Sequence, residues 1–143
     1  MVGKAFGWLY HLDRGMEEER RKKIETFEDL LVWQKSIEIA KQIYLISTDD
    51  NLSKDFALRD QLRRAALSIS SNIAEGFERS SKKEYLNFLN FAKGSAGELR
   101  SLLLVASEIG YLDPIRHNEL RNSILEISRY LSNQIKSIRK SCL

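Results

Sequence analysis

Apolar residues recur every three or four positions along most of the chain, a spacing that predicts α-helices. We expect four helices, at residues 27–46, 56–77, 81–109 and 114–139. A polar connection that includes residues 48–53 separates the first two. Because short connections between helices place neighbours antiparallel, the pattern predicts an all-α protein built as an antiparallel, up-down-up-down four-helix bundle.

Residues typical of helix ends mark the third and fourth helices. Ser81 and Glu84 have the spacing of a capping box, in which each side chain satisfies a free backbone N–H group. Gly110 can adopt the left-handed conformation that ends a helix. Asp113 before Pro114 is the preferred order of an N-cap followed by a first helical residue. The ends therefore support what the periodicity predicts.

The third helix has more apolar surface than one neighbour can cover. Its first apolar seam consists of Tyr85, Leu89, Ala92, Ala96, Leu99, Leu103 and Ala106. Beside it runs a second seam, which consists of Phe88, Phe91, Leu102, Val105 and Ile109. Either this helix is the most central one, or the second seam packs against another subunit. Gly94 and Gly97 favour a subunit contact, because close backbone approach would offset the ~1 kcal/mol that each glycine costs inside a helix.

The first and fourth helices show simpler patterns. The fourth has one apolar stripe, which consists of Leu120, Ile124, Ile127, Leu131, Ile135 and Ile138. The first has one row that we expect in the core, made up of Leu30, Trp33, Ile37, Ala40 and Tyr44. An adjacent row is a further candidate surface for another subunit, made up of Val32, Ile39, Ile43 and Ile46. Trp33 and Tyr44 could stack nucleic-acid bases, but core packing is more common at such positions.

The composition agrees with one helical domain. The chain has 143 residues, 43% of them hydrophobic, and one proline, which suits a single core. We assign residues 25–140 to the bundle and 1–24 to a flexible tail or frayed helix, in which Met16 could be a second start site. The one cysteine, Cys142, excludes an intramolecular disulfide and suits a reducing cytoplasm. No apolar run approaches the ~20 residues that cross a bilayer, so we expect no membrane contact.

The formal net charge of +3 is modest, so a site for a polyanion must come from local clustering. Arg79, Lys82 and Lys83 lie at the start of the third helix, where free N–H groups and the helix dipole attract anions. The alternative is a solvated, well-capped turn. Lys136, Arg139 and Lys140 suit a helix C-terminus and could extend a basic face.

A second basic group lies on the second helix. It consists of Arg59, Arg63 and Arg64. Asp55 and Asp60 stand four residues before Arg59 and Arg64, a spacing that permits local ion pairs. Arg63 is therefore the least compensated of the three cations.

Four polar residues fall on or near faces that otherwise look apolar: Asn72, Glu75, Ser95 and Glu98. Because unpaired polar groups are costly to bury, we expect a hydrogen-bond network between the second and third helices. The alternative is a carboxylate metal site that adds Glu108, but the Glu-x-x-His pattern of di-iron bundles is absent. No histidine stands beside a central serine, and no glycine-rich phosphate loop is present. We therefore expect no metal, no cofactor and no enzymatic activity.

Several short motifs in the second and third helices resemble those of a known family. The second helix contains LRDQLRRAA at 58–66 and SISSNIAEGF at 68–77. The third contains FL at 88–89, AKGS at 92–95 and EL at 98–99, and GYL follows at 110–112. With Phe27, Leu31, Trp33 and Gln34, these motifs resemble the bacterial four-helix bundle family named for proteins encoded in intervening sequences of 23S ribosomal RNA genes. The resemblance covers about residues 25–139.

The family resemblance implies a homopentamer, which favours a subunit contact for the second seam of the third helix. The chain is also similar to the accessory protein of diversity-generating retroelements, a pentameric bundle with basic surfaces that works with a reverse transcriptase and nucleic acid. From the resemblance we take self-association and a candidate nucleic-acid surface made up of Arg59, Arg63, Arg64, Arg79, Lys82, Lys83 and Lys93.

Two functional hypotheses follow. The first is an oligomeric, non-enzymatic adaptor that binds structured RNA or DNA and is associated with ribosomal RNA or a retroelement. The alternative is a protein-interaction scaffold without nucleic-acid contact, for which the partner could be a reverse transcriptase or another protein.

Overall fold

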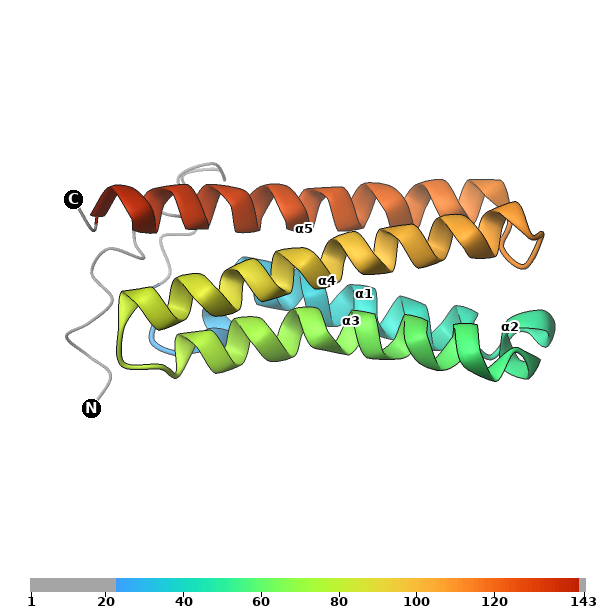
Figure 1. The fold of residues 1–143 in the computed structure, drawn as a ribbon, viewed down its shortest axis with the longest axis horizontal. Coiled ribbons are helices and arrows are strands. Elements are labelled where there is room, and N and C mark those ends of the chain that lie inside the picture. The colour runs from blue at the N-terminus through green and yellow to red at the C-terminus, as the bar shows by residue number, and fades with distance from the viewer. Residues whose placement is uncertain (1–22, 142–143) are drawn as a thin grey trace.

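The computed structural model describes residues 23–141, and every regular element in this range is helical. The elements are a 3-10 helix, η2 (Phe27–Asp29), and the α-helices α1 (Leu31–Ile46), α2 (Asp50–Lys54), α3 (Phe56–Phe77), α4 (Lys82–Glu108) and α5 (Pro114–Ser141). The four long helices lie lengthwise beside one another (Figure 1) and enclose one apolar core. The all-helical prediction is therefore confirmed. No helix within residues 23–141 is long and apolar enough to span a membrane.

One of the first described residues belongs to the core. Of the predicted tail, residues 1–22, including Met16, lie outside the described residues. Ile24, which the prediction placed in the tail, is buried and joins the apolar core. The packed part of the chain thus includes at least one residue before residue 25.

The α-helix α1 begins four residues later than predicted. The carboxylate of Asp29 accepts hydrogen bonds from the backbone N–H groups of Glu25 (2.9 Å) and Thr26 (3.0 Å). These bonds accompany a tight 3-10 turn at 27–29, after which Leu30 is extended, with φ −72° and ψ 122°. Asp29 thus satisfies free N–H groups just before the 3-10 turn, as in a capping box, and the regular helix starts at Leu31, directly after the extended Leu30.

The apolar rows of α1 do not face as the sequence predicted. Its buried apolar residues are Val32, Ile39, Ala40, Ile43 and Ile46. The row expected to be an outer surface is therefore in the core, which corrects that prediction. In the row expected to be buried, Leu30 and Ala40 are in the core as predicted. Trp33 of that row is only half-buried, against Phe27 with ring centroids 5.2 Å apart, and Tyr44 is 41% exposed. Neighbouring rows on a helix are close in angle, so periodicity alone did not decide which one faces inward.

A short helix, α2, occupies part of the predicted polar connection. Leu52 anchors it, because this side chain is fully buried among otherwise polar neighbours. Asp55 ends α2 and then caps α3, where its carboxylate accepts a hydrogen bond from the backbone N–H group of Leu58 at 3.2 Å. One apolar residue gives no periodic signal, which is why the sequence did not predict this turn of helix.

The core-facing seams of α4 and α5 are those that the sequence predicted. The buried residues of α4 are Tyr85, Leu89, Ala92, Ala96, Leu99, Leu103 and Ala106. Those of α5 are its predicted stripe together with Gln134. On the second seam of α4, by contrast, Phe91, Val105 and Ile109 are 59%, 47% and 51% exposed. Phe88 and Leu102 of that seam are half-buried.

The turn between α4 and α5 has the predicted geometry. Gly110 has a positive φ of 82°, and the N–H group of Tyr111 donates to the carbonyl of Ala106 at 2.8 Å, as in a Schellman motif. The carboxylate of Asp113 then accepts from the N–H group of Ile115 at 3.0 Å and caps α5.

Candidate nucleic-acid interface

The predicted nucleic-acid residues fall mainly into two groups at opposite ends of the molecule. Arg59, Arg63 and Arg64 lie in the first half of α3, whereas Arg79 follows its last turn (Figure 1). At 1.5 Å per residue, Arg63 and Arg79 are about 24 Å apart along the helix axis. Lys93 is exposed in the first half of α4. The seven residues therefore do not form one continuous basic face.

The end of α5 completes one of the two groups. The N-terminus of α4 and the C-terminus of α5 lie at the same end (Figure 1), and Lys82 Nζ donates to Ser141 Oγ at 3.2 Å. We call this cluster the basic end, and it consists of Arg79, Lys82, Lys83, Lys136, Arg139 and Lys140. The acidic residues of the same segments are Glu75, Glu78 and Glu84. The basic end therefore has a net positive charge.

The cations of the basic end differ in whether a carboxylate lies close enough to neutralise their charge. Arg79 pairs with Glu75 at 2.7 Å, and its guanidinium carbon lies 5.0 Å from the ring centre of Phe88. Glu75, predicted in a network with α4, thus has its ion pair within the α3 segment. Among the described residues, no carboxylate lies within ion-pair distance of Lys83 or Lys140. These exposed ammonium groups have the chemistry that phosphate oxygens need.

The second group of cations packs on exposed aromatic rings. The guanidinium carbon of Arg59 lies 4.8 Å from the ring centre of Phe56, and that of Arg63 lies 4.7 Å from the ring centre of Tyr44. Phe56 is 65% exposed and Tyr44 is 41% exposed. We call these four residues the arginine–aromatic patch. The patch therefore combines two cations with two exposed aromatic rings, each pair within cation–π distance.

The local partners of these arginines differ from those that the spacing permits. Arg59 donates to the neighbouring carboxylate of Asp60 at 2.9 Å, and Arg64 donates to the side-chain oxygen of Gln61 at 2.8 Å. The hydrogen bond from Arg59 holds the pKa of the Asp60 carboxyl below its usual range, and the charges of Arg59, Arg64 and Arg63 lower it further. The single negative charge of Asp60 is therefore outnumbered by the positive charges of the three nearby arginines.

The predicted polar network is connected by a residue that the sequence did not single out. Ser68 Oγ lies 2.9 Å from Ser95 Oγ on α4 and accepts a hydrogen bond of 2.9 Å from the side-chain amide of Asn72. Further along the same two helices, Gln61 donates to the carboxylate of Glu98. Ser68 stands four residues before Asn72, so helical spacing was the signal that could have revealed it.

Nothing within residues 23–141 explains the two glycines inside α4. A Cβ atom placed on Gly94 or Gly97 would meet no atom within 4 Å. Close packing among the described residues is therefore not the reason that these two helix positions lack a side chain.

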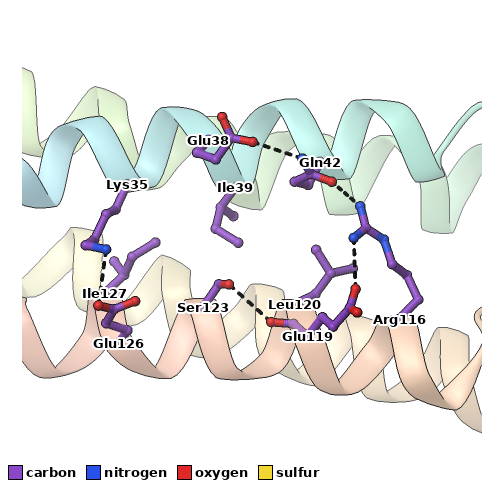
Figure 2. Close-up of a pocket in the computed structure, with 10 residues that line it drawn as sticks. All are labelled: Lys35, Glu38, Ile39, Gln42, Arg116, Glu119, Leu120, Ser123, Glu126 and Ile127. Carbon is purple, nitrogen blue, oxygen red and sulfur yellow. Dashed lines mark hydrogen bonds and ion pairs between the residues drawn. The ribbon is translucent and has the colours of Figure 1, made fainter.

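A groove of about 260 Å³ lies between α1 and α5 (Figure 2). Near one end, Lys35 pairs with Glu126 at 3.1 Å, and near the other, Arg116 contacts Gln42 across the two helices. Its lining includes no histidine or cysteine. Over residues 23–141, no three histidine, cysteine, aspartate or glutamate side chains are grouped as metal ligands would be. The absence of enzymatic activity stays a prediction from the sequence.

The sequence did not predict the aromatic half of the second group. Tyr44 was expected in the core, and Phe56 was taken only as the start of a helix. Phe56, Arg59 and Arg63 have the spacing i, i+3, i+7, which places them on one face of α3. The missing signal was the neighbouring helix, because Tyr44 reaches this face from α1.

One apolar core of packed helices with two charged surface clusters defines this chain as a small helical-bundle protein. The model of the 23S rRNA-intervening sequence protein family matches residues 28–133, and the chain belongs to this family. A similar solved structure is the 1.70 Å crystal structure of a protein of unknown function from the S23 ribosomal protein family of Bacteroides thetaiotaomicron VPI-5482. It is 30% identical, has a TM-score of 0.70, and the match covers 74% of this chain and 99% of that one. No curated protein matches the chain.

Proposed function

We propose that this protein is a non-enzymatic binding protein whose basic end contacts the phosphate backbone of structured RNA or DNA. The observation that supports this function most is that the start of α4 lies beside the end of α5. This arrangement brings Arg139 and Lys140 into one cluster with Lys82 and Lys83. Clustered ammonium and guanidinium groups release counterions when they contact phosphates, and this release is the main source of sequence-independent affinity. The net charge of the chain is only +3, so one subunit binds weakly.

Assembly raises that weak affinity. In this proposal the subunit is an antiparallel bundle, and the second seam of α4 joins subunits into a homo-oligomer, a pentamer as the family resemblance implies. The exposure of Phe91, Val105 and Ile109 supports this contact, and the uncovered surfaces of Gly94 and Gly97 would admit close backbone approach. Several basic ends on one assembly bind one long polyanion together, which multiplies affinity without a new contact.

The cellular setting follows from the same resemblance. The proposed nucleic acid is ribosomal RNA or the nucleic acid of a retroelement in the cytoplasm, with a reverse transcriptase as a candidate protein partner. Exposed apolar residues outside this seam, such as Leu45 and Leu67 at 62% and 43% exposure, support a second function, in which the protein is a scaffold that binds another protein without touching nucleic acid.

Fluorescence anisotropy with a structured ribosomal RNA fragment tests the first function. We expect the affinity to fall steeply with salt concentration. Lys82→Glu combined with Lys83→Glu should weaken binding roughly tenfold and reduce the slope of log affinity against log salt by about 2, because each lost phosphate contact removes nearly one unit.

A charge-matched control separates a local contact from net charge. Lys83→Glu and Arg121→Glu each replace one exposed cation, at the basic end and in the first half of α5 respectively. The first should weaken binding and the second should not. Equal effects, or no salt-sensitive association at all, would overturn the nucleic-acid function. A protein partner that stays bound after nuclease treatment and in high salt would instead favour the scaffold.

A further inference from the structure

The arginine–aromatic patch has two exposed aromatic side chains on one side of the molecule. Phe56 begins α3 and Tyr44 lies near the end of α1, and they are 65% and 41% exposed. Single exposed apolar residues are common, but here each ring has a guanidinium group at cation–π distance, 4.8 Å for Arg59 and 4.7 Å for Arg63. The patch is thus a set of four planar groups and not a scattered apolar surface.

Hydrogen bonds hold the two guanidinium groups in place. Arg63 Nε donates to Ser47 Oγ at 2.8 Å, which ties the side chain to the end of α1. Arg59 donates to the carbonyl of Ser53 at 3.0 Å and to the carboxylate of Asp60 at 2.9 Å. Side chains that are already ordered lose less entropy when they bind a ligand.

The spacing of the planar groups suits a short run of bases. Phe56, Arg59 and Arg63 follow one face of α3, and Phe56 and Arg63 are about 10 Å apart along the axis. Successive nucleotides of one strand rise by roughly 3.4 Å. The patch is therefore about as long as two or three stacked bases.

The local charge suits a polyanion. The carboxylate of Asp60 lies in the field of Arg59, Arg63 and Arg64, so this part of α3 has an excess of positive charge. Asp55, just before α3, accepts a hydrogen bond at the N-terminus of that helix. Beside Phe56, an open recess is also lined by Lys54, Asp55 and Tyr111, so another cation, the capping carboxylate and another ring border the patch.

We propose that the arginine–aromatic patch binds an unpaired segment of RNA by stacking bases on Tyr44 and Phe56 while the arginines contact its phosphates. This inference rests on the proposed nucleic-acid function and adds a second contact at the opposite end of the molecule from the basic end. In a duplex, neighbouring base pairs cover the base faces, so only unpaired bases can stack on protein rings. Folded RNA presents such bases in its loops and bulges.

The test compares one short, unstructured, fluorescein-labelled RNA oligonucleotide with the same oligonucleotide annealed to its complement. Tyr44→Leu combined with Phe56→Leu keeps apolar bulk at both positions but removes the ring faces. We expect this variant to lose at least about tenfold in affinity for the single strand, because stacking contributes strongly for each base. Its affinity for the duplex should be unchanged.

A conservative swap and a crosslinking measurement complete the design. Tyr44→Phe combined with Phe56→Tyr keeps both rings and should bind the single strand like the wild type. Ultraviolet crosslinking of the wild-type complex should attach RNA to peptides that contain Tyr44 or Phe56. Circular dichroism and light scattering of each variant verify that fold and assembly are unchanged.

The possible results separate this inference from the proposed function. If the leucine variant binds the single strand like the wild type while Lys82→Glu with Lys83→Glu abolishes binding, the inference is overturned and the role of the basic end stands. If the leucine variant changes the mass of the assembly, the patch is a subunit contact and the inference is also wrong. If the wild type binds neither RNA at any salt concentration, both proposals fall.

Discussion

Gly76 is the one glycine in the described part of the chain at which a neighbouring helix packs closely: α4 lies directly against it. A Cβ atom at this position would lie 2.6 Å from Phe88 Cβ and 3.0 Å from the ring of Tyr85. We expect Gly76→Ala to lower the free energy of unfolding by about 1–3 kcal/mol, because the packed helices would have to separate or their side chains leave preferred rotamers. Urea denaturation at fixed protein concentration measures this change.

Gly94→Ala is the matched control for that substitution. Gly94 is also inside a long helix, but a Cβ atom there would meet nothing within 4 Å. In the separated subunit, alanine should therefore be stabilising by about 1 kcal/mol through helix propensity, so both variants are compared at a protein concentration at which the proposed subunit contact is dissociated. If the Gly76→Ala variant had the same free energy of unfolding as the wild type, that result would contradict the close approach of α3 and α4.

At the scale of elements, the start of α4 depends on one serine. Ser81 Oγ accepts a hydrogen bond from the N–H group of Glu84 at 3.2 Å and donates to the carboxylate of Glu84 at 2.9 Å. The predicted cap is present, although this carboxylate bonds to the serine hydroxyl and not to the N–H group of the N-cap residue, as a full capping box would have it.

We expect Ser81→Ala to destabilise the protein by about 1 kcal/mol, because the N–H group of Glu84 loses its acceptor. Thermal denaturation followed by circular dichroism measures the loss. Ser80→Ala is the control, since Ser80 is exposed one residue before the cap. Equal stability of the two variants would show that the cap contributes little.

The elements also differ in how well the sequence predicted them. The bounds of α3 and α4 follow from strong periodicity and from side chains that end helices, and both were predicted closely. For α1, the row with Trp33 and Tyr44 looked at least as apolar as the row that is buried. Hydrophobicity ranks the two rows, but the positions of α3 and α5 decide which row they cover.

At the scale of the whole molecule, the exposed seam of α4 predicts self-association. Val105→Asp should reduce the mass measured by light scattering toward that of one chain, 16.6 kDa, because a carboxylate in an apolar contact is costly to desolvate. Val105 is 47% exposed within the subunit, so the fold itself should tolerate the change.

Ile115→Asp provides the comparison, since Ile115 is 71% exposed at the start of α5. It introduces the same charge away from the seam and should leave the mass unchanged. A wild-type protein that is strictly monomeric would contradict the proposed assembly, and a mass loss in both variants would contradict the assignment to α4.

The sequence by itself determined the helical class, the ends of the long helices, the core-facing seams of α4 and α5, and the family. These properties depend on local spacing and on residues that cap or end helices, which act within a few positions of one another. The tertiary structure decided which row of α1 is buried and how Ser68 links α3 to α4. It also decided the meeting of Lys82 with the end of α5 and the cation–π contact of Arg63 with Tyr44. Each of these pairs joins residues far apart in the chain, so no local pattern of apolar and polar positions specifies it.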